Sequence, residues 1–462
     1  MPLPGNVVAR QALAAVALAA AAGALGFGVA HEPRIALAVG AAAAAWLTLV
    51  SAEFRLLAVI GGAALVLEST PGLSPVKAAY AGLLGLATVV AAHTCLAERR
   101  KTGRRALYDT VSAASCLMAL AIVAASAVGL SRGANASILI RDALPYALLA
   151  VAPLLALDFA HRLDAAFLRT TLVVAGVVIT VVTARRVSAE HYAAPNPLEG
   201  VDRSVFASVV FGGVVFAYTL AQAARPSSEL TAAARAGWLA VAGAIVVLML
   251  VSGTRATVLL ALPIVVVAIA RFGWRAVRWM PVAVAAVALV TAAAFGIARA
   301  VGVGADRLDR LELVVDAVRS PGADSSLQDR FTQSDITWSR FRDQPALGVG
   351  LGHVFRWTAP GGHPREQFRV DSSVSTLAKF GTVGGLSIIG FLVAIALALR
   401  RFGAPTERLA AVGAATWLLA YGVLTNVFED KGLALSLLLL LALALHDTLR
   451  EPGTDRTLPL SS

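Results

Sequence analysis

The sequence predicts an all-α, polytopic membrane protein with about 12–14 transmembrane helices and one large, mainly helical loop outside the cytoplasm. Composition is the first reason: 58% of the 462 residues are hydrophobic and 15% are charged, whereas soluble proteins are about half apolar and about a quarter charged. The mean hydropathy is +0.77. The second reason is a series of apolar runs, and the third is one polar, arginine-rich stretch at 301–373.

Each apolar run of about twenty residues is a candidate membrane span. The first run continues directly into further spans, so we interpret it as a helix and not as a cleaved signal peptide. The third run is short and ends in Glu68-Ser-Thr-Pro71-Gly, which leaves a broken or re-entrant helix as an alternative. The predicted spans lie near 8–29, 35–51, 55–68, 78–97, 108–130, 142–158, 166–184, 204–224, 234–252, 255–270, 279–299, 374–400, 408–427 and 431–448.

Arginine and lysine residues in short loops predict the orientation, because such loops tend to stay in the cytoplasm. Basic runs that begin at Arg99, Arg271 and Arg400 follow the fourth, tenth and twelfth spans. All three loops are even-numbered, so a single orientation with both termini in the cytoplasm satisfies them. We therefore expect a multi-pass protein of the cytoplasmic (inner) membrane. The predicted regions are transmembrane helices in 1–300, an extracytoplasmic catalytic loop at 301–373, C-terminal transmembrane helices at 374–450 and a cytoplasmic tail at 451–462.

The net charge of +11 does not indicate a nucleic-acid partner, because the basic residues are scattered between apolar spans and form no basic face on a soluble domain. Cys95 and Cys116 both lie in predicted spans and carry no information about redox compartment. No set of His, Asp and Glu residues has the spacing of metal ligands. The sequence therefore predicts neither a metal nor a cofactor.

The loop itself has recognisable parts. Apolar residues on one face predict an amphipathic helix over 307–319, and a second helix is expected over 327–342, closed by Pro345. The turn that follows contains Gly348, Gly350 and Gly352. Glycine permits backbone conformations and close approaches that other residues do not, so we expect a structural turn beside the site.

The loop resembles that of the O-antigen ligase and polymerase family, membrane glycosyltransferases that act on polyprenyl-diphosphate-linked glycans. The resemblance covers about 180–400. One departure is that the family usually has a histidine, often His-Asn, where this chain has Val370-Asp371-Ser372. The residues that carry the resemblance are Arg330, Trp338, Pro345, the turn from Leu347 to Gly352, the segment from Asp371 to Gly384, and upstream the short turn Ser252-Gly253-Thr254-Arg255.

The resemblance implies a GT-C-like fold and a metal-independent, inverting transfer of a glycan from undecaprenyl diphosphate, or a similar carrier, to a glycan or glycolipid acceptor. Arginine binds phosphate with a two-pronged geometry. We therefore assign Arg255, Arg185 or Arg186, and Arg330 to the donor diphosphate. The alternatives are that Arg255, Arg185 and Arg186 anchor helix ends, and that Arg330 pairs with Asp329, Asp335 or another acidic residue of the loop.

The acceptor hydroxyl needs a general base. Asp371 is the first candidate, followed by His363 and His353; the alternative role for Asp371 is a helix N-cap. Trp338 and Ser372 are candidate sugar or acceptor contacts, although Trp338 is also a candidate packing anchor. Charged residues at span ends, among them Asp142 and the group from Glu429 to Lys431, are explained by an interfacial position.

The missing histidine favours a polymerase or divergent transferase over a ligase. Two other classes of function remain. A transporter or flippase of lipid-linked sugars also needs a cationic path, but it usually has inverted repeats and polar residues near the midplane. A catalytically inactive scaffold of a polysaccharide assembly complex is the other alternative.

Overall fold

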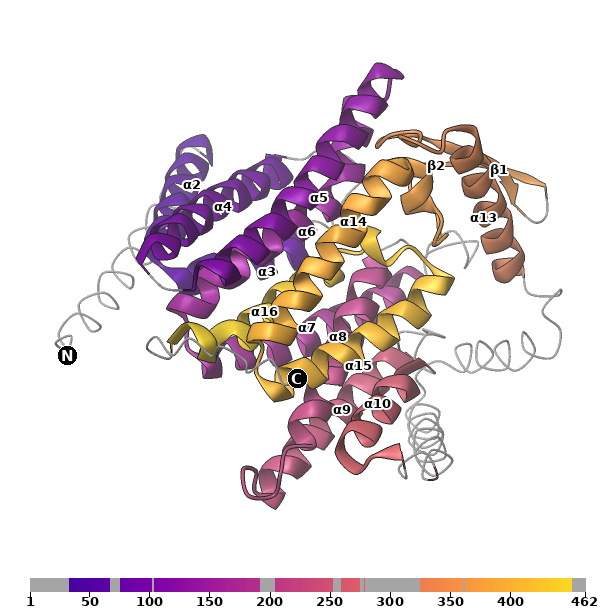
Figure 1. Ribbon diagram of the computed structural model, residues 1–462. Coiled ribbons are helices and arrows are strands. Elements are labelled where there is room, and N and C mark those ends of the chain that lie inside the picture. The colour runs from indigo at the N-terminus through magenta and orange to yellow at the C-terminus, as the bar shows by residue number, and fades with distance from the viewer. Residues whose placement is uncertain are drawn as a thin grey trace, which may run out of the picture. The chain divides into compact units, whose positions relative to one another are not determined.

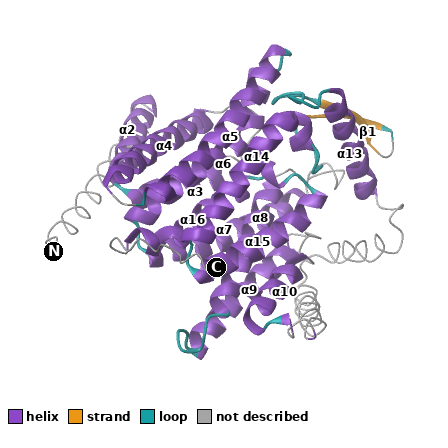
Figure 2. Cartoon of the chain, viewed as in Figure 1, coloured by secondary structure: helices purple, strands orange, loops and turns teal. Residues whose placement is uncertain are grey.

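The protein is an all-α polytopic membrane protein with one small β-hairpin (Figures 1 and 2). The computed structural model describes residues 33–66, 75–101, 104–191, 204–251, 259–274, 278, 325–359 and 362–450. These residues include six helices that are long and apolar enough to cross a membrane. The predicted spans at 8–29 and 279–299 and the predicted helix at 307–319 lie outside the described residues.

The chain divides into two compact units, 1–100 and 101–462. The first contains α2 (Pro33–Val50), α3 (Ala52–Val66) and α4 (Pro75–Lys101). Tyr80 of α4 donates a hydrogen bond of 2.9 Å to the carbonyl of Val59 in α3, and its ring lies against Gly62. Arg55 is fully buried and donates to the carbonyls of Thr48 and Leu49 at the end of α2. The third predicted span is thus a short helix, α3, whose one arginine is satisfied by its neighbour.

The second unit contains the other described helices and the hairpin. Helix α6 packs on α16 and α5 packs on α14, and α6 and α16 are the inner pair, since 72% of the most apolar window of each is buried. The elements are α5 (Arg105–Ser131), α6 (Ala136–Arg162), α7 (Ala165–His191), α8 (Ser204–Ala223), α9 (Ala232–Val251), α10 (Ala261–Phe272), α13 (Ser325–Asp343), β1 (Phe355–Ala359), β2 (His363–Gln367), α14 (Ser375–Phe402), α15 (Pro405–Leu424), η4 (Val427–Glu429) and α16 (Lys431–Arg450).

The described part of the loop forms a small folded layer beside the beginning of α14 (Figure 1). Helix α13 matches the expected helix at 327–342, whereas the antiparallel pairing of β1 with β2 was not predicted. Alternate residues of β1 are buried, as expected for a strand with one face on a core. That core consists of Val349, Phe355, Trp357, Val370 and Ala378, with Ile336 and Phe341 at its edge.

Helix α14 is interrupted near its start. Gly381 has φ 63° and ψ −170°, which breaks the helical hydrogen-bond ladder. The loop segment that follows α13 fills the break. The amides of Val349 and Gly350 donate to the carbonyls of Ala378 and Lys379, at 2.7 and 3.0 Å. The amide of Thr382, past the break, donates to the carbonyl of Pro345. The loop and the helix therefore share backbone groups that a continuous helix satisfies internally.

Candidate functional site

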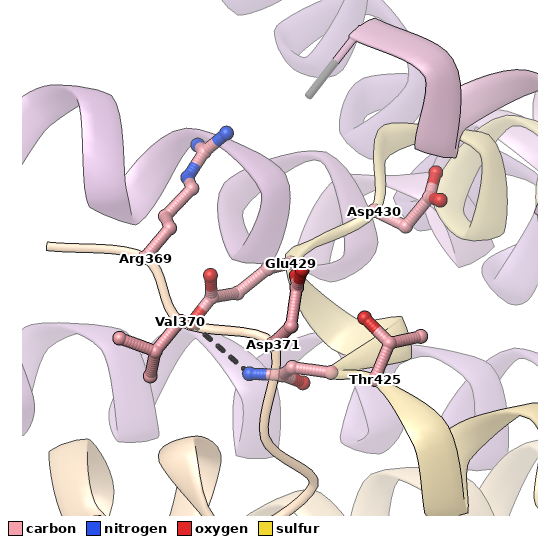
Figure 3. A pocket seen from close by; sticks show the side chains of 7 residues that line it. Arg369, Val370, Asp371, Thr425, Glu429 and Asp430 are labelled. Atoms are coloured by element: carbon pink, nitrogen blue, oxygen red, sulfur yellow. Dashed lines mark hydrogen bonds between the residues drawn. The ribbon is translucent and has the colours of Figure 1, made fainter. Parts of the chain in front are cut away.

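A recess opens where the end of the loop, before α14, meets the segment between α15 and α16 (Figure 3). Its volume of about 40 Å³ is room for a few water molecules, at about 10–15 Å³ each. It therefore accommodates hydroxyl groups and not a whole sugar ring. The lining residues are Arg369, Val370, Asp371, Thr425, Asn426, Glu429 and Asp430.

Beneath the recess lies a group of three buried charges, which we call the ion triad: Asp142, Lys379 and Glu429. The ammonium of Lys379 lies 2.6 Å from Oδ1 of Asp142 and 2.7 Å from Oε1 of Glu429. The side chains of Lys379 and Asp142 are wholly buried, and that of Glu429 is 7% exposed. Two carboxylates and one ammonium leave one excess negative charge. Burying these ions costs several kcal/mol each unless they are well paired, so the three groups depend on one another.

The ion triad corrects the interfacial explanation given above for Asp142 and Glu429. Asp142 lies in the second turn of α6 and Lys379 in the second turn of α14, while Glu429 immediately precedes Asp430 and α16. In the predicted topology all three helices begin on the same side of the membrane. Their first turns meet in the structure, so these charges lie in protein and not at the lipid interface.

Asn426 fixes the orientation of Glu429. Its amide nitrogen donates to Oε1 of Glu429 at 3.0 Å and to the hydroxyl of Ser375 at 2.6 Å, and its oxygen accepts from Thr376 at 2.9 Å. Every hydrogen bond that Glu429 makes through its carboxylate uses Oε1. Oε2 makes none with the described residues, and the side chain borders the recess (Figure 3).

Asp371 lies on the opposite side, in the segment before α14, and its side chain points toward the segment that carries Glu429 and Asp430 (Figure 3). Its backbone amide donates to Oε1 of Gln333 in α13 at 2.6 Å, which fixes the position of the main chain. The N-cap alternative for Asp371 does not hold, because α14 begins at Ser375 with Val374 as the N-cap and no side-chain cap.

Gln333 connects Asp371 to the core of the loop. Its amide nitrogen donates to Oδ2 of Asp329 at 2.8 Å, and Oδ1 of Asp329 accepts from the indole of Trp357 at 2.8 Å. Side chains of α13 and β1 and the backbone amide of Asp371 therefore form one hydrogen-bonded chain. It is neutral except for Asp329, in contrast to the ion triad.

The three predicted turn glycines all adopt the left-handed region, with φ of 67° at Gly348, 86° at Gly350 and 80° at Gly352. A Cβ on Gly350 would lie 2.3 Å from the backbone nitrogen of Gly129 in α5. The amide of Gly352 donates to Oδ2 of Asp142 at 2.9 Å. The turn therefore packs directly on α5 and orients one member of the ion triad.

The two candidate sugar contacts differ in exposure. Ser372 is 1% exposed, and its hydroxyl lies 2.9 Å from that of Thr337 and accepts from the amide of Val374. Ser372 therefore joins the segment before α14 to α13. Trp338 is 44% exposed and packs against Phe341 at 5.4 Å between ring centroids, which leaves much of its indole open to a ligand.

The histidines lie outside the set of residues that line the recess. His353 is half-buried with its ring edge against Phe355. Burial, together with the nearby cations of Arg340, Lys379, Arg132 and Arg356, lowers its pKa to about 4. So weakly basic an imidazole is a poor proton acceptor at neutral pH. His363 begins β2, opposite Ala359.

Arginines also reach the recess. Arg369 lines it, donates to the carbonyl of Arg141 at 2.6 Å and lies over the ring of Phe368. Arg330, Asp371 and Asp430 all lie within electrostatic range of the Tyr421 hydroxyl. Within the described part of the chain, the alternative pair of Arg330 with Asp329 or Asp335 is not formed; Asp329 binds Gln333 and Trp357 instead.

The remaining arginine candidates are placed only in part. Arg185 and Arg186 lie in α7, which continues to His191 and so extends beyond the predicted end of that span at 184. Arg255 lies outside the described residues. Across the described ranges no group of three His, Cys, Asp or Glu residues is placed to hold a metal ion.

Sequence reasoning missed Lys379, Asn426 and the role of Arg369. A signal existed for Lys379, one of four lysines in the chain, which stands in an apolar run; a charge there requires a partner. The partner, Asp142, is 237 positions away, so only the fold identifies it. No family model matches the sequence, and no curated protein sequence matches it.

Proposed function

We propose that the protein is an integral membrane glycosyltransferase that polymerises or ligates a polyprenyl-diphosphate-linked glycan at the outer face of the cytoplasmic membrane. The observation that carries the proposal is the recess, in which Arg369 and Asp371, from the segment before α14, meet Glu429, from the segment before α16. It joins carboxylates, which suit activation of a hydroxyl, to a guanidinium, which suits a phosphate. The resemblance of the loop supplies the substrate class.

In the proposed reaction the acceptor oxygen attacks the anomeric carbon of the donor on the face opposite the diphosphate. The bond from carbon to acceptor oxygen forms as the bond to the diphosphate oxygen breaks, and that electron pair leaves with the diphosphate. Asp371 takes the proton of the hydroxyl. Arg369 and Arg330, with Arg255 from the upstream turn, balance the charge that develops on the leaving group. No metal is required in this scheme.

The test is glycan transfer by the purified protein in detergent, with an undecaprenyl-diphosphate-linked oligosaccharide as donor and products resolved by mass. We expect Asp371→Asn to lower kcat about 10²–10⁴-fold, the usual contribution of a general base. Asp335→Asn, an exposed change in α13, is the matched control and should be near wild type. Absence of transfer by the wild type, with glycan and glycolipid acceptors alike, would contradict the proposal.

Arg255→Ala tests the diphosphate assignment in the same assay. We expect a large loss of transfer, because a charge-assisted contact to the leaving group is removed. Arg271→Ala, at the exposed end of α10, is the control for loss of one arginine. Full activity of Arg255→Ala would remove this residue from the site.

One observation favours transport of lipid-linked sugars as a second candidate. Helix α14 is broken at Gly381, two residues from the buried Lys379, and broken helices beside buried charges are common in transporters. Against it, the ion triad lies within the first two turns of its helices and not near their middle. Proteoliposomes decide between the two: a transporter moves an intact labelled lipid-linked sugar between leaflets, and a transferase does not.

A further inference from the structure

Glu429 has an arrangement that the scheme above does not use. Its side chain is more than nine-tenths buried, yet only one of its two oxygens is engaged. Oε1 accepts from Lys379, from Asn426 and, at 3.5 Å, from Ser375. Oε2 makes no hydrogen bond with any described residue, and the side chain borders the recess. The carboxylate is thus fixed on one side and open on the side of the recess.

The recess suits a particular partner for Oε2. It has room for a few water molecules (about 40 Å³), and it is bordered by a second carboxylate, Asp371. A sugar presents neighbouring hydroxyl groups of that size. A single hydroxyl has one proton, so it cannot serve both carboxylates at once, whereas two adjacent hydroxyls can.

We propose that Glu429 is a further substrate-binding residue, which accepts a hydrogen bond through Oε2 from a second hydroxyl of the acceptor sugar while Asp371 takes the proton of the reacting one. This inference rests on the proposed function and specifies its acceptor: a sugar with a hydroxyl next to the one that is glycosylated. Lys379 and Asn426 are positioning residues, because they hold Oε1 and so direct Oε2 into the recess.

The charge of the ion triad favours an acceptor that donates hydrogen bonds. The ion triad has one excess negative charge, and a hydroxyl that donates to Oε2 stabilises it without proton transfer. The charged and titratable groups that face Glu429 from the surrounding elements are Lys379 of α14, Asp142 and Tyr146 of α6, Asp371 and Arg369 of the loop and Asp430 before α16, with Arg330 of α13 and Tyr421 of α15 nearby.

The experiment compares wild type, Glu429→Gln and Asp371→Asn with the acceptor used in the transfer assay and with its mono-deoxy analogues. In Glu429→Gln the recess-facing oxygen is replaced by an NH₂ donor while Lys379 and Asn426 keep an oxygen to bind. We expect the KM for the acceptor to rise roughly 10–100-fold, the value of a hydrogen bond to a charged group. The kcat and the KM for the donor should stay within a few-fold of wild type. Asp371→Asn should instead lower kcat.

The analogues provide a second, independent readout. One mono-deoxy acceptor, lacking the hydroxyl next to the reacting one, should show the same rise in KM with the wild type. The same analogue should lose little more with Glu429→Gln, because the contact is already absent. Glu366→Gln, an exposed carboxylate in the hairpin that is paired with Arg356, is the matched control. If Glu429→Gln fails to fold, the wild type with the analogue series still tests the contact.

The possible failures are distinct. Transfer that Glu429→Gln leaves unchanged, or deoxy analogues that all bind the wild type as well as the parent acceptor does, would overturn the inference and leave the proposed function standing. Absence of transfer by the wild type refutes the proposed function, and this inference with it. A fall in kcat with unchanged KM in Glu429→Gln would identify Glu429 as the base and also contradict the inference as stated.

Discussion

The two sides of the recess are built by different physical means. On the side of Glu429, buried ions hold each other in place, with Lys379 between two carboxylates. On the side of Asp371, mostly neutral hydrogen bonds lead from Gln333 to the indole of Trp357. Removal of one ion from a buried pair leaves an uncompensated charge, whereas removal of a neutral group leaves one unsatisfied partner. Loss of the shared cation, Lys379, should therefore disturb the whole first side, whereas the second side should fail by degrees.

The largest effect should follow from Lys379→Met, which leaves Asp142 and Glu429 buried without a cation. We expect a loss of about 3–5 kcal/mol in the free energy of unfolding, as for other broken buried pairs, measured by denaturation in detergent. The neutral triple variant, with Asp142→Asn and Glu429→Gln added, should recover much of that stability. Arg356→Met, which breaks an exposed pair with Glu366, is the control and should cost about 0–1 kcal/mol. Equal losses in the two single variants would contradict the distinction between buried and exposed pairs.

The glycine turn connects the two sides, and Gly350→Ala should separate it from α5. A Cβ there would lie 2.3 Å from the nitrogen of Gly129, so over-packing of about 1–3 kcal/mol adds to about 1–2 kcal/mol for the left-handed backbone. Gly362→Ala isolates the backbone term, because φ is 83° at Gly362 but nothing lies within 4 Å of a Cβ there. A smaller loss of stability for Gly350→Ala than for Gly362→Ala would disprove the close packing.

A smaller effect is expected from Gln333→Leu on the neutral side. This change leaves the amide of Asp371 and one oxygen of Asp329 without their partners, at about 1–3 kcal/mol for the unsatisfied groups. Thermal unfolding in detergent measures the loss. Gln328→Leu, an exposed position on the same helix, should change stability by less than about 0.5 kcal/mol. A loss from Gln333→Leu as large as that from Lys379→Met would remove the contrast between the two sides.

The smallest effect concerns the pH dependence of stability, and it tests whether burial and the nearby cations lower the pKa of His353. The pKa of His353 falls from its ordinary 6.5 to about 4 in the folded protein, so the unfolded chain binds more protons in that range. Stability from this residue is present above pH 6.5 and declines as the pH falls toward 4. In His353→Gln the melting temperature should therefore fall less between pH 7 and pH 5 than in the wild type. His93→Gln, an exposed histidine of α4, should leave the pH dependence unchanged.

Local patterns in the sequence predicted the helices well. The apolar runs at 374–400 and 431–448 are α14 and α16, and the expected loop helix at 327–342 is α13 (Ser325–Asp343), because helix length and capping are encoded in neighbouring residues. The hairpin was missed because its five-residue strands are short and one contains Pro364. Strand pairing of this kind depends on the core beneath it.

The candidate site was predicted on one side only. Asp371 was identified by its position in the loop, but Lys379 was given no role and Glu429 was explained as an ordinary charge at a span end. Their importance depends on burial and on ion partners in other segments, Asp142 of α6 for Lys379 and Lys379 of α14 for Glu429, and neither property is local in the sequence. Conversely, Ser372 fitted the pattern of a contact residue, but its hydroxyl is used within the protein by Thr337.

The break at Gly381 has a consequence for hydrogen exchange. The amides of Val349, Gly350 and Leu351 lie in a turn, yet they donate to carbonyls of α14 and α5. Each can exchange with solvent only when the turn separates from the helix that it binds, α14 for Val349 and Gly350 and α5 for Leu351. In deuterated buffer these three amides should exchange as slowly as the helices they bind and far more slowly than the exposed end of the hairpin at Gly362. Their exchange rate would thus report how often the loop and α14 separate at the edge of the recess.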